Sequence, residues 1–181
     1  MKKIISSVVV ASLFATGAFA FNAKMDPELS FTGYKMENKT AVGGTFKKFE
    51  FKSEKKDSFI DFAKTIDIKI ESTGLTTKNP LRDKRIASIF KNEAIMAKIV
   101  DVKGDENKGE FTLEITANGV TKTYNAPYEV KDGKLAASAV LDVLDFSLNE
   151  TFNKFAETCK ALHGGKTWSE AKVDMNLIIE K

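Results

Sequence analysis

The chain has 181 residues, with 28 Lys and Arg, 25 Asp and Glu and 43% hydrophobic residues, which is enough for one domain with a packed core. The formal net charge of +3 is too small for the basic surface typical of a nucleic-acid-binding protein. The single cysteine, Cys159, excludes an intrachain disulfide, and together with the single histidine, His163, it excludes a zinc or copper site built from several thiolates or imidazoles.

The N-terminus has the pattern of a secretory signal peptide. Lys2 and Lys3 precede an apolar run over residues 4–14, and Ala18 and Ala20 form an A-x-A cleavage pattern. The run is shorter than the roughly 20 residues that a membrane-spanning helix needs, and no later segment is apolar enough. We therefore expect cleavage after Ala20, leaving one periplasmic domain over residues 21–181 that does not span the membrane.

Most of the chain alternates between apolar and polar residues, the period typical of half-buried β-strands. Ile66, Ile68 and Ile70, for example, alternate with charged residues. The first three strands are expected over residues 29–35, 41–52 and 60–72. Four more form a meander over residues 94–142, in which Asn118-Gly119 and Asp132-Gly133 favour type I′ hairpin turns, and an eighth covers residues 169–180.

Two segments have helical patterns instead. Asn79 as N-cap and Pro80 at the first helical position predict a short helix over residues 80–91. Ser147 and Glu150 match a capping box, which predicts a longer helix that ends at Gly164-Gly165. Its apolar stripe consists of Leu148, Phe152, Phe155, Cys159 and Leu162. We expect this Phe-rich stripe to close one end of the fold.

An antiparallel sheet of eight strands has two exposed edges unless it closes on itself. We therefore expect an all-β fold, an eight-stranded antiparallel β-barrel with one short and one longer packed α-helix. Side chains can fill the interior of such a barrel or leave room for one small ligand. The small residues Ala137 and Ala139 on the inward face favour a cavity.

No residue pattern indicates catalysis, and we expect no enzyme activity. His163 falls in the last turn of the second helix, where it can bond free carbonyls; contact with a ligand and catalysis are the alternatives. Cys159 lies on the apolar stripe, where a buried thiol is expected. Asp142 and Asp145 have the spacing of turn and cap residues.

Several motifs carry a family resemblance. The strongest covers residues 68–90, where a strand leads through Leu75-Thr76-Thr77 to the Arg82-Asp83 pair and to the segment 86–90. The others are Gly44-Thr45-Phe46, the hairpin at residues 118–122, Asp145-Phe146 and Gly165-Lys166-Thr167-Trp168. In this order they resemble the YceI-like family, the lipocalin-like polyisoprenoid-binding proteins of bacterial envelopes. The resemblance implies an eight-stranded lipocalin-like barrel, a hydrophobic pocket for an isoprenoid or fatty-acyl chain, often a homodimer, and no catalytic residues.

Together these observations predict periplasmic binding and transport of a long-chain apolar lipid, which is a polyisoprenoid, an isoprenoid quinone or a fatty-acid derivative. No cofactor is expected besides this bound polyisoprenoid or fatty-acyl ligand. The alternatives are a solid-core barrel that acts in protein interactions or envelope stress, and an enzyme acting on a lipid. The side chains expected to contact the lipid are Phe31, Phe49, Phe51, Ile66, Ile68, Ile70, Phe90, Ile99, Phe111, Leu113, Ile115, Tyr124, Leu141 and Phe152.

For three further residues the sequence leaves two alternatives. Arg82 and Asp83 are candidates for contact with a lipid head group, because a guanidinium and a carboxylate can bind one; the alternative is a structural role at the barrel mouth. Phe46 has the opposite parity to Phe49, so it faces outward unless a bulge intervenes.

Overall fold

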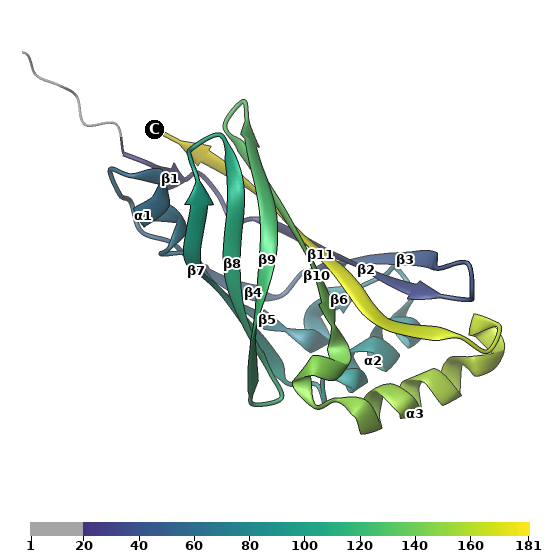
Figure 1. Ribbon diagram of the computed structural model, residues 1–181. Coiled ribbons are helices and arrows are strands. Elements are labelled where there is room, and N and C mark those ends of the chain that lie inside the picture. The colour runs from purple at the N-terminus through teal and green to yellow at the C-terminus, as the bar shows by residue number, and fades with distance from the viewer. Residues whose placement is uncertain (1–19) are drawn as a thin grey trace, which may run out of the picture.

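The computed structural model describes residues 20–181, so the signal peptide expected over residues 1–20 lies, apart from Ala20, outside the described residues. The described chain is an elongated, strongly curved antiparallel sheet with one helix at one end and two at the other (Figure 1). The strands are β1 (Asn22–Ala23), β2 (Glu28–Lys35), β3 (Thr40–Phe46), β4 (Phe49–Lys52), β5 (Asp67–Glu71), β6 (Leu75–Thr76), β7 (Ala94–Gly104), β8 (Lys108–Ala117), β9 (Val120–Lys131), β10 (Lys134–Asp142) and β11 (Thr167–Glu180). The helices are α1 (Phe59–Ala63), α2 (Pro80–Ile89) and α3 (Asn149–Cys159), and the 3-10 turns are η1 (Ser72–Gly74), η2 (Val143–Phe146) and η3 (Lys160–His163).

The expected meander is confirmed. β7, β8, β9 and β10 pair in sequence order, and the sheet continues through β11 and β2 to β3. Asn118 and Gly119 have φ values of 50° and 71°, and Asp132 and Gly133 have 52° and 73°. These left-handed values at both central positions are those of the type I′ turns that the two pairs favour.

Two long strands bend at one corner of the sheet, and the pairing between them closes the sheet into a barrel. β3 runs into β4 through Lys47 and Lys48, and β5 runs into β6 through η1. β3 pairs with β6 and β4 pairs with β5. Between these pairs the Lys47 amide donates to the Gly74 carbonyl (2.9 Å) and the Glu71 amide to the Lys48 carbonyl (3.0 Å). The antiparallel lipocalin-like barrel is therefore confirmed as the fold.

The strand count differs from the expected eight, because the described chain has eleven. The corner divides the strand expected over residues 41–52 into β3 and β4, the short strand β6 was not expected, and the two-residue β1, also not expected, pairs with the end of β11. The expected strand over residues 41–52 is thus one strand with a break. The break also settles the direction of Phe46, because Phe46 and Phe49 both pack against the core on the inside.

The expectation of a strand starting at residue 60 is wrong, because α1 occupies residues 59–63. The Ser58 side chain accepts a hydrogen bond from the Asp61 amide (3.3 Å), which caps the helix. Phe59, Phe62 and Ala63 are buried along one side of α1. A helix here buries these three residues together, whereas an extended segment would place neighbouring residues on opposite faces.

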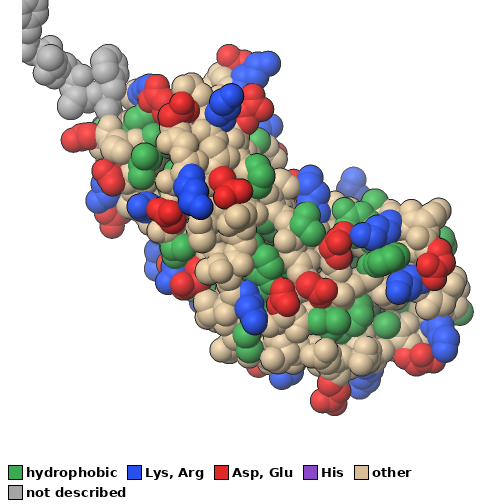
Figure 2. Space-filling model, viewed as in Figure 1, with side chains coloured by type: hydrophobic (Ala, Val, Ile, Leu, Met, Phe, Trp, Pro, Cys, Tyr) green, Lys and Arg blue, Asp and Glu red, His purple; other side chains and the backbone are tan. Residues whose placement is uncertain are grey.

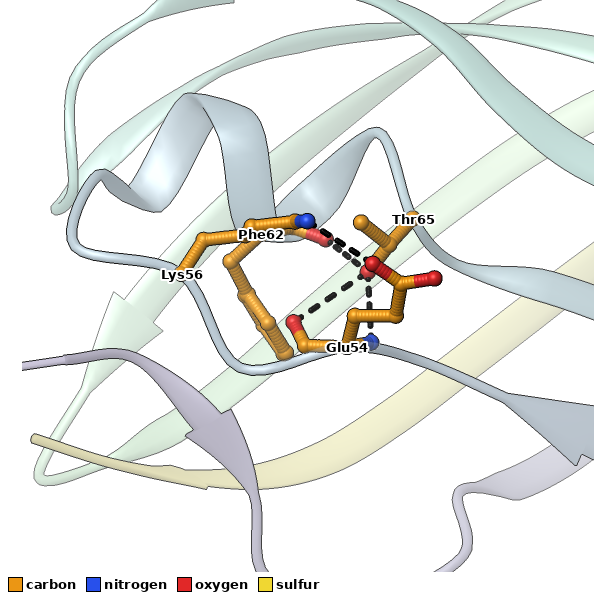
Figure 3. Close-up of polar contacts among 4 residues, drawn as sticks. All are labelled: Glu54, Lys56, Phe62 and Thr65. Atoms are coloured by element: carbon orange, nitrogen blue, oxygen red, sulfur yellow. Dashed lines mark hydrogen bonds and ion pairs between the residues drawn. The ribbon is translucent and has the colours of Figure 1, made fainter.

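Thr65 joins the end of α1 to the loop that follows β4 (Figure 3). Its hydroxyl donates to the Phe62 carbonyl (2.7 Å) and lies 2.8 Å from the Glu54 amide, from which it accepts. The Lys56 ammonium pairs with the Glu54 carboxylate at 2.7 Å, on the outside of this junction. These contacts hold α1 against the end of the barrel.

The α1 end of the barrel is solid. Phe62 and Phe111 are fully buried, and Phe59 packs between Phe21 and Tyr128 with ring centroids 5.6 and 5.5 Å away. The rings of Phe111 and Tyr128 stack at 4.0 Å. This aromatic core closes one end of the barrel, so any internal space lies toward α2 and α3.

The short helix is confirmed as α2. The Asn79 side chain accepts a hydrogen bond from the Arg82 amide (3.0 Å), and Pro80 is the first helical residue. Both features are those from which the helix was predicted.

The longer helix, α3, is confirmed, but its capping box is wrong. Ser147 has a φ of 55° and ends the turn η2, whereas an N-cap residue needs extended backbone angles. Leu148 is the residue before the helix and makes no side-chain cap. Instead the Thr151 hydroxyl donates to the Ile89 carbonyl (2.7 Å), which ties α3 to the end of α2. Both helices therefore lie together at the wide end of the barrel (Figure 1).

Candidate functional site

A cavity of about 500 Å³ occupies the half of the barrel that α2 and α3 cover. Its walls come from the inward faces of β2, β5, β7, β8, β10 and β11 and from the facing sides of the two helices. Its volume falls within the roughly 300–1,000 Å³ of sites that bind small molecules. The space-filling view shows hydrophobic side chains gathered on the half of the molecule that carries α3, with Lys and Arg among them (Figure 2).

Most of the side chains predicted to contact a ligand line this cavity. Eleven of the fourteen do so, namely Phe31, Ile66, Ile68, Ile70, Phe90, Ile99, Phe111, Leu113, Ile115, Leu141 and Phe152. They come from seven different elements or the segments beside them, and the closure of the barrel brings them together. Phe111 lies at the boundary, because its ring both lines the cavity and stacks on Tyr128 in the solid core.

Phe49, Phe51 and Tyr124 do not line the cavity, contrary to the prediction. Phe49 and Phe51 on β4 are partly buried and pack against the hydrophobic core cluster without reaching the cavity. The Tyr124 hydroxyl donates to the Asp145 carboxylate (2.8 Å), which holds the ring behind Phe146. Burial and the bond to Asp145 raise the pKa of Tyr124 above its usual value. The alternation of β9 is correct, but η2 covers this part of its inward face.

The sequence prediction missed much of the helical wall of the cavity. The apolar residues on that wall and the segments around it include Ile86, Ile89, Val143, Phe146, Phe155, Cys159 and Leu162. The apolar stripe of α3 already contained Phe155, Cys159 and Leu162, so their spacing was the available signal. Leu81 and Leu162 are 59% and 60% exposed although they line the cavity, and so they mark its mouth.

Arg82 and Asp83 both bind the chain segment just before α2. The Arg82 guanidinium donates to the Thr77 hydroxyl (2.8 Å) and carbonyl (2.9 Å). The Asp83 carboxylate accepts from the amide and the hydroxyl of Thr77. Burial alone would raise the pKa of Asp83, but the bonds from Thr77 and Thr76 and the charge of Arg82 hold it below its ordinary value. Arg82 also lines the cavity, whereas Asp83 does not.

His163 and Trp168 stand on the cavity wall near the mouth. The His163 Nδ1 atom lies 2.7 Å from the Thr167 hydroxyl, so it bonds a side chain and not the free carbonyls that its helical position predicted. The Trp168 indole donates to the Met36 carbonyl (2.8 Å), which fixes the ring on β11. The sequence contains one tryptophan and one histidine, and both face the same cavity.

Residues 20–181 contain no group of three His, Cys, Asp or Glu side chains that could hold a metal ion. Within the same range no helix has the length and apolarity to cross a membrane.

The fold and the cavity define the class of this protein: a lipocalin-like antiparallel barrel with an internal apolar cavity under two helices. A family model described as the YceI-like domain matches residues 21–178. The chain therefore belongs to the YceI-like family. No curated protein matches it.

Solved structures share the fold at low sequence identity. A polyisoprenoid-binding domain from Saccharophagus degradans, implicated in plant cell wall breakdown, has 14% identity and a TM-score of 0.61 over 90% of this chain and 98% of its own. BcnA from Burkholderia cenocepacia has 14% identity and a TM-score of 0.56, covering 86% and 96%. The YceI protein of Campylobacter jejuni has 20% identity and a TM-score of 0.53, covering 78% and 86%. These likenesses show the fold.

Proposed function

We propose that the chain binds a long-chain apolar lipid in its cavity and carries it through the periplasm. The observation that carries the proposal is the division of the barrel into a solid aromatic end and an apolar cavity with its mouth at the helical end. A barrel that served only as a rigid surface would have no need for an open interior. The lipid is a polyisoprenoid, an isoprenoid quinone or a fatty-acid derivative.

The walls of the cavity can supply the binding energy without a catalytic or metal group. At about 25 cal/mol per Å², removing roughly 400 Å² of hydrocarbon tail from water gives about 10 kcal/mol before the costs of association. Because the aromatic core closes the far end, the tail enters from the side of α2 and α3. The Saccharophagus degradans neighbour, described as a polyisoprenoid-binding domain, supports this choice of ligand.

Native mass spectrometry of the protein purified from its own envelope fraction tests the proposal. We expect a population heavier than the mature chain by the mass of one lipid, which organic extraction removes. The extracted protein should then rebind a long-chain lipid and change the fluorescence of Trp168, the single tryptophan, which lines the cavity. A protein that carries no lipid and whose Trp168 fluorescence does not respond to any of these lipid classes would favour the solid-core alternative.

Export is part of the proposal and has its own test. Cell fractionation should place the chain in the periplasm, with an N-terminus that begins at Phe21. A full-length chain that stays in the cytoplasm would contradict the export step and leave the lipid-binding step standing.

A further inference from the structure

Two cationic side chains line the cavity near its mouth and come from different elements. Lys35 ends β2 and Arg85 lies in the middle of α2, and both are half-buried. Lys35 pairs in the sheet with Thr167, whose hydroxyl lies 2.7 Å from the Nδ1 atom of His163 in η3, and Arg85 lines the same cavity as His163. Burial lowers the pKa of His163, and the positive charges of Lys35 and Arg85 lower it further. Lys35, Arg85 and His163 thus all contribute to the wall of one cavity.

The carboxylates that line the same cavity are already paired. Glu170 pairs with Lys39 at 3.0 Å, and Asp174 pairs with Lys172 at 2.7 Å. Among residues 20–181, neither Lys35 nor Arg85 forms an ion pair, and neither side chain forms a hydrogen bond. Within the described part of the chain, two positive charges at the edge of an apolar cavity therefore have no paired carboxylate.

Arg82, one turn before Arg85 on α2, differs in this respect. Two of its guanidinium nitrogens donate to Thr77, so its side chain is fixed by the fold. Arg85 also lines the cavity but has no such partner in residues 20–181, so its donors are available to a ligand. The two arginines thus have separate roles, and the cationic subsite consists of Lys35 and Arg85.

We propose that Lys35 and Arg85 bind the anionic end group of the lipid whose tail fills the cavity, a carboxylate or a phosphate monoester. This inference rests on the proposed lipid binding and specifies the ligand further. With the tail among the inward isoleucines and phenylalanines, the end group lies at the mouth, where the two cations and the His163 ring meet it. Charge-assisted hydrogen bonds from a guanidinium and an ammonium suit both anions, and the two arms of the test below separate them.

Matched pairs of ligands with the same tail test the proposal on the delipidated protein. Oleate is compared with oleamide, and farnesyl phosphate with farnesol, at pH 8 and below the concentrations at which they aggregate, with Trp168 fluorescence as the signal. In the native chain at least one anion should bind about tenfold more tightly than its neutral partner, which corresponds to about 1.4 kcal/mol. Arg85→Gln and Lys35→Gln should each remove most of that advantage, measured as the ratio of anion affinity to neutral-ligand affinity within the same variant.

Lys84→Gln is the matched control, because Lys84 is exposed on α2 beside Arg85 and does not line the cavity. It makes the same charge change and should leave the preference for the anion intact. An equal loss in Lys84→Gln and Arg85→Gln would show a general charge effect and would overturn the subsite.

The single histidine gives a readout that does not depend on affinity. The anionic ligand should raise the pKa of His163, measured by NMR, because it offsets the charges of Lys35 and Arg85, whereas the neutral partner should not. Equal binding of anion and neutral partner, with no such difference at His163, would overturn the head-group subsite alone. Failure of all four ligands to bind would overturn the proposed function and this inference with it.

Discussion

Ala137→Phe tests whether the barrel interior is open, because Ala137 lies on β10 and lines the cavity. A phenylalanine ring at this position points into the cavity and displaces roughly four methylene groups of a bound tail. At about 0.8 kcal/mol per methylene, lipid binding should weaken by about 3 kcal/mol, or roughly 200-fold. The affinity is measured from the fluorescence of Trp168, which lies on a different strand.

The stability of the same variant is a second and independent measure of whether the interior is open. In an open cavity the new ring buries apolar surface without displacing neighbours, so the free energy of unfolding of the lipid-free protein should stay equal or rise by about 1–2 kcal/mol. In a packed interior the same ring would cost about 1–3 kcal/mol. Urea unfolding of the delipidated protein measures the difference.

Ala63→Phe is the matched control at the solid end. Ala63 is fully buried in α1 among the aromatic core and does not line the cavity. We expect this variant to lose at least about 1–3 kcal/mol through overpacking while it retains lipid affinity when folded. If Ala137→Phe destabilises the protein as much as Ala63→Phe does, the interior is packed at both positions and the barrel has no open space beside Ala137.

Three further variants test single features of the structure. The buried Ser72 hydroxyl has no hydrogen-bond partner in the described chain. Ser72→Ala should therefore leave the free energy of unfolding in urea unchanged or raise it by up to about 1 kcal/mol, and a clear loss of stability would show that the hydroxyl has a partner. Asp83→Asn should cost about 1–3 kcal/mol at neutral pH. The pKa of Asp83 in the folded protein lies below its ordinary value, so this stabilisation is present above the pKa of the unfolded chain and should vanish as pH falls through the pKa of the folded one. A stability difference between Asp83→Asn and the native chain that does not change with pH would contradict this role. Gly44→Ala should destabilise by about 1–3 kcal/mol, because its new Cβ would overlap the Phe31 ring on the cavity wall and crowd the Thr76 carbonyl; an unchanged midpoint would contradict this close packing.

The strands and turns could be predicted because their signals are local. Alternation sets the two faces of each strand, and Asn118-Gly119 and Asp132-Gly133 supply the left-handed angles of the hairpins. The bend at Lys47 and Lys48 has no such signal, since it depends on the pairing with β5 and β6. The short α1 was missed because its apolar residues adjoin those of β5 and were assigned to one strand.

The candidate site was predictable where it follows from strand parity and not where it depends on packing between distant elements. Strand alternation identified Ile66, Ile68 and Ile70, which all line the cavity. The exclusion of Tyr124 depends on η2 covering β9, which no local pattern encodes. The presence of Lys35, Arg85 and His163 on the wall of one cavity likewise depends on three elements that are far apart in the sequence.

Phe111 links the two halves of the barrel and sets the depth of the cavity. Its ring is fully buried and stacks on Tyr128 in the solid half, while its other side lines the cavity. Tyr128 is itself fixed, because its hydroxyl donates to the Asp105 carbonyl (2.6 Å). The floor of the cavity is therefore held by the same stacking that stabilises the closed end. In the proposed complex the lipid tail ends at the Phe111 ring and its other end lies toward α2 and α3, so the position of Phe111 sets the length of tail that the cavity can hold.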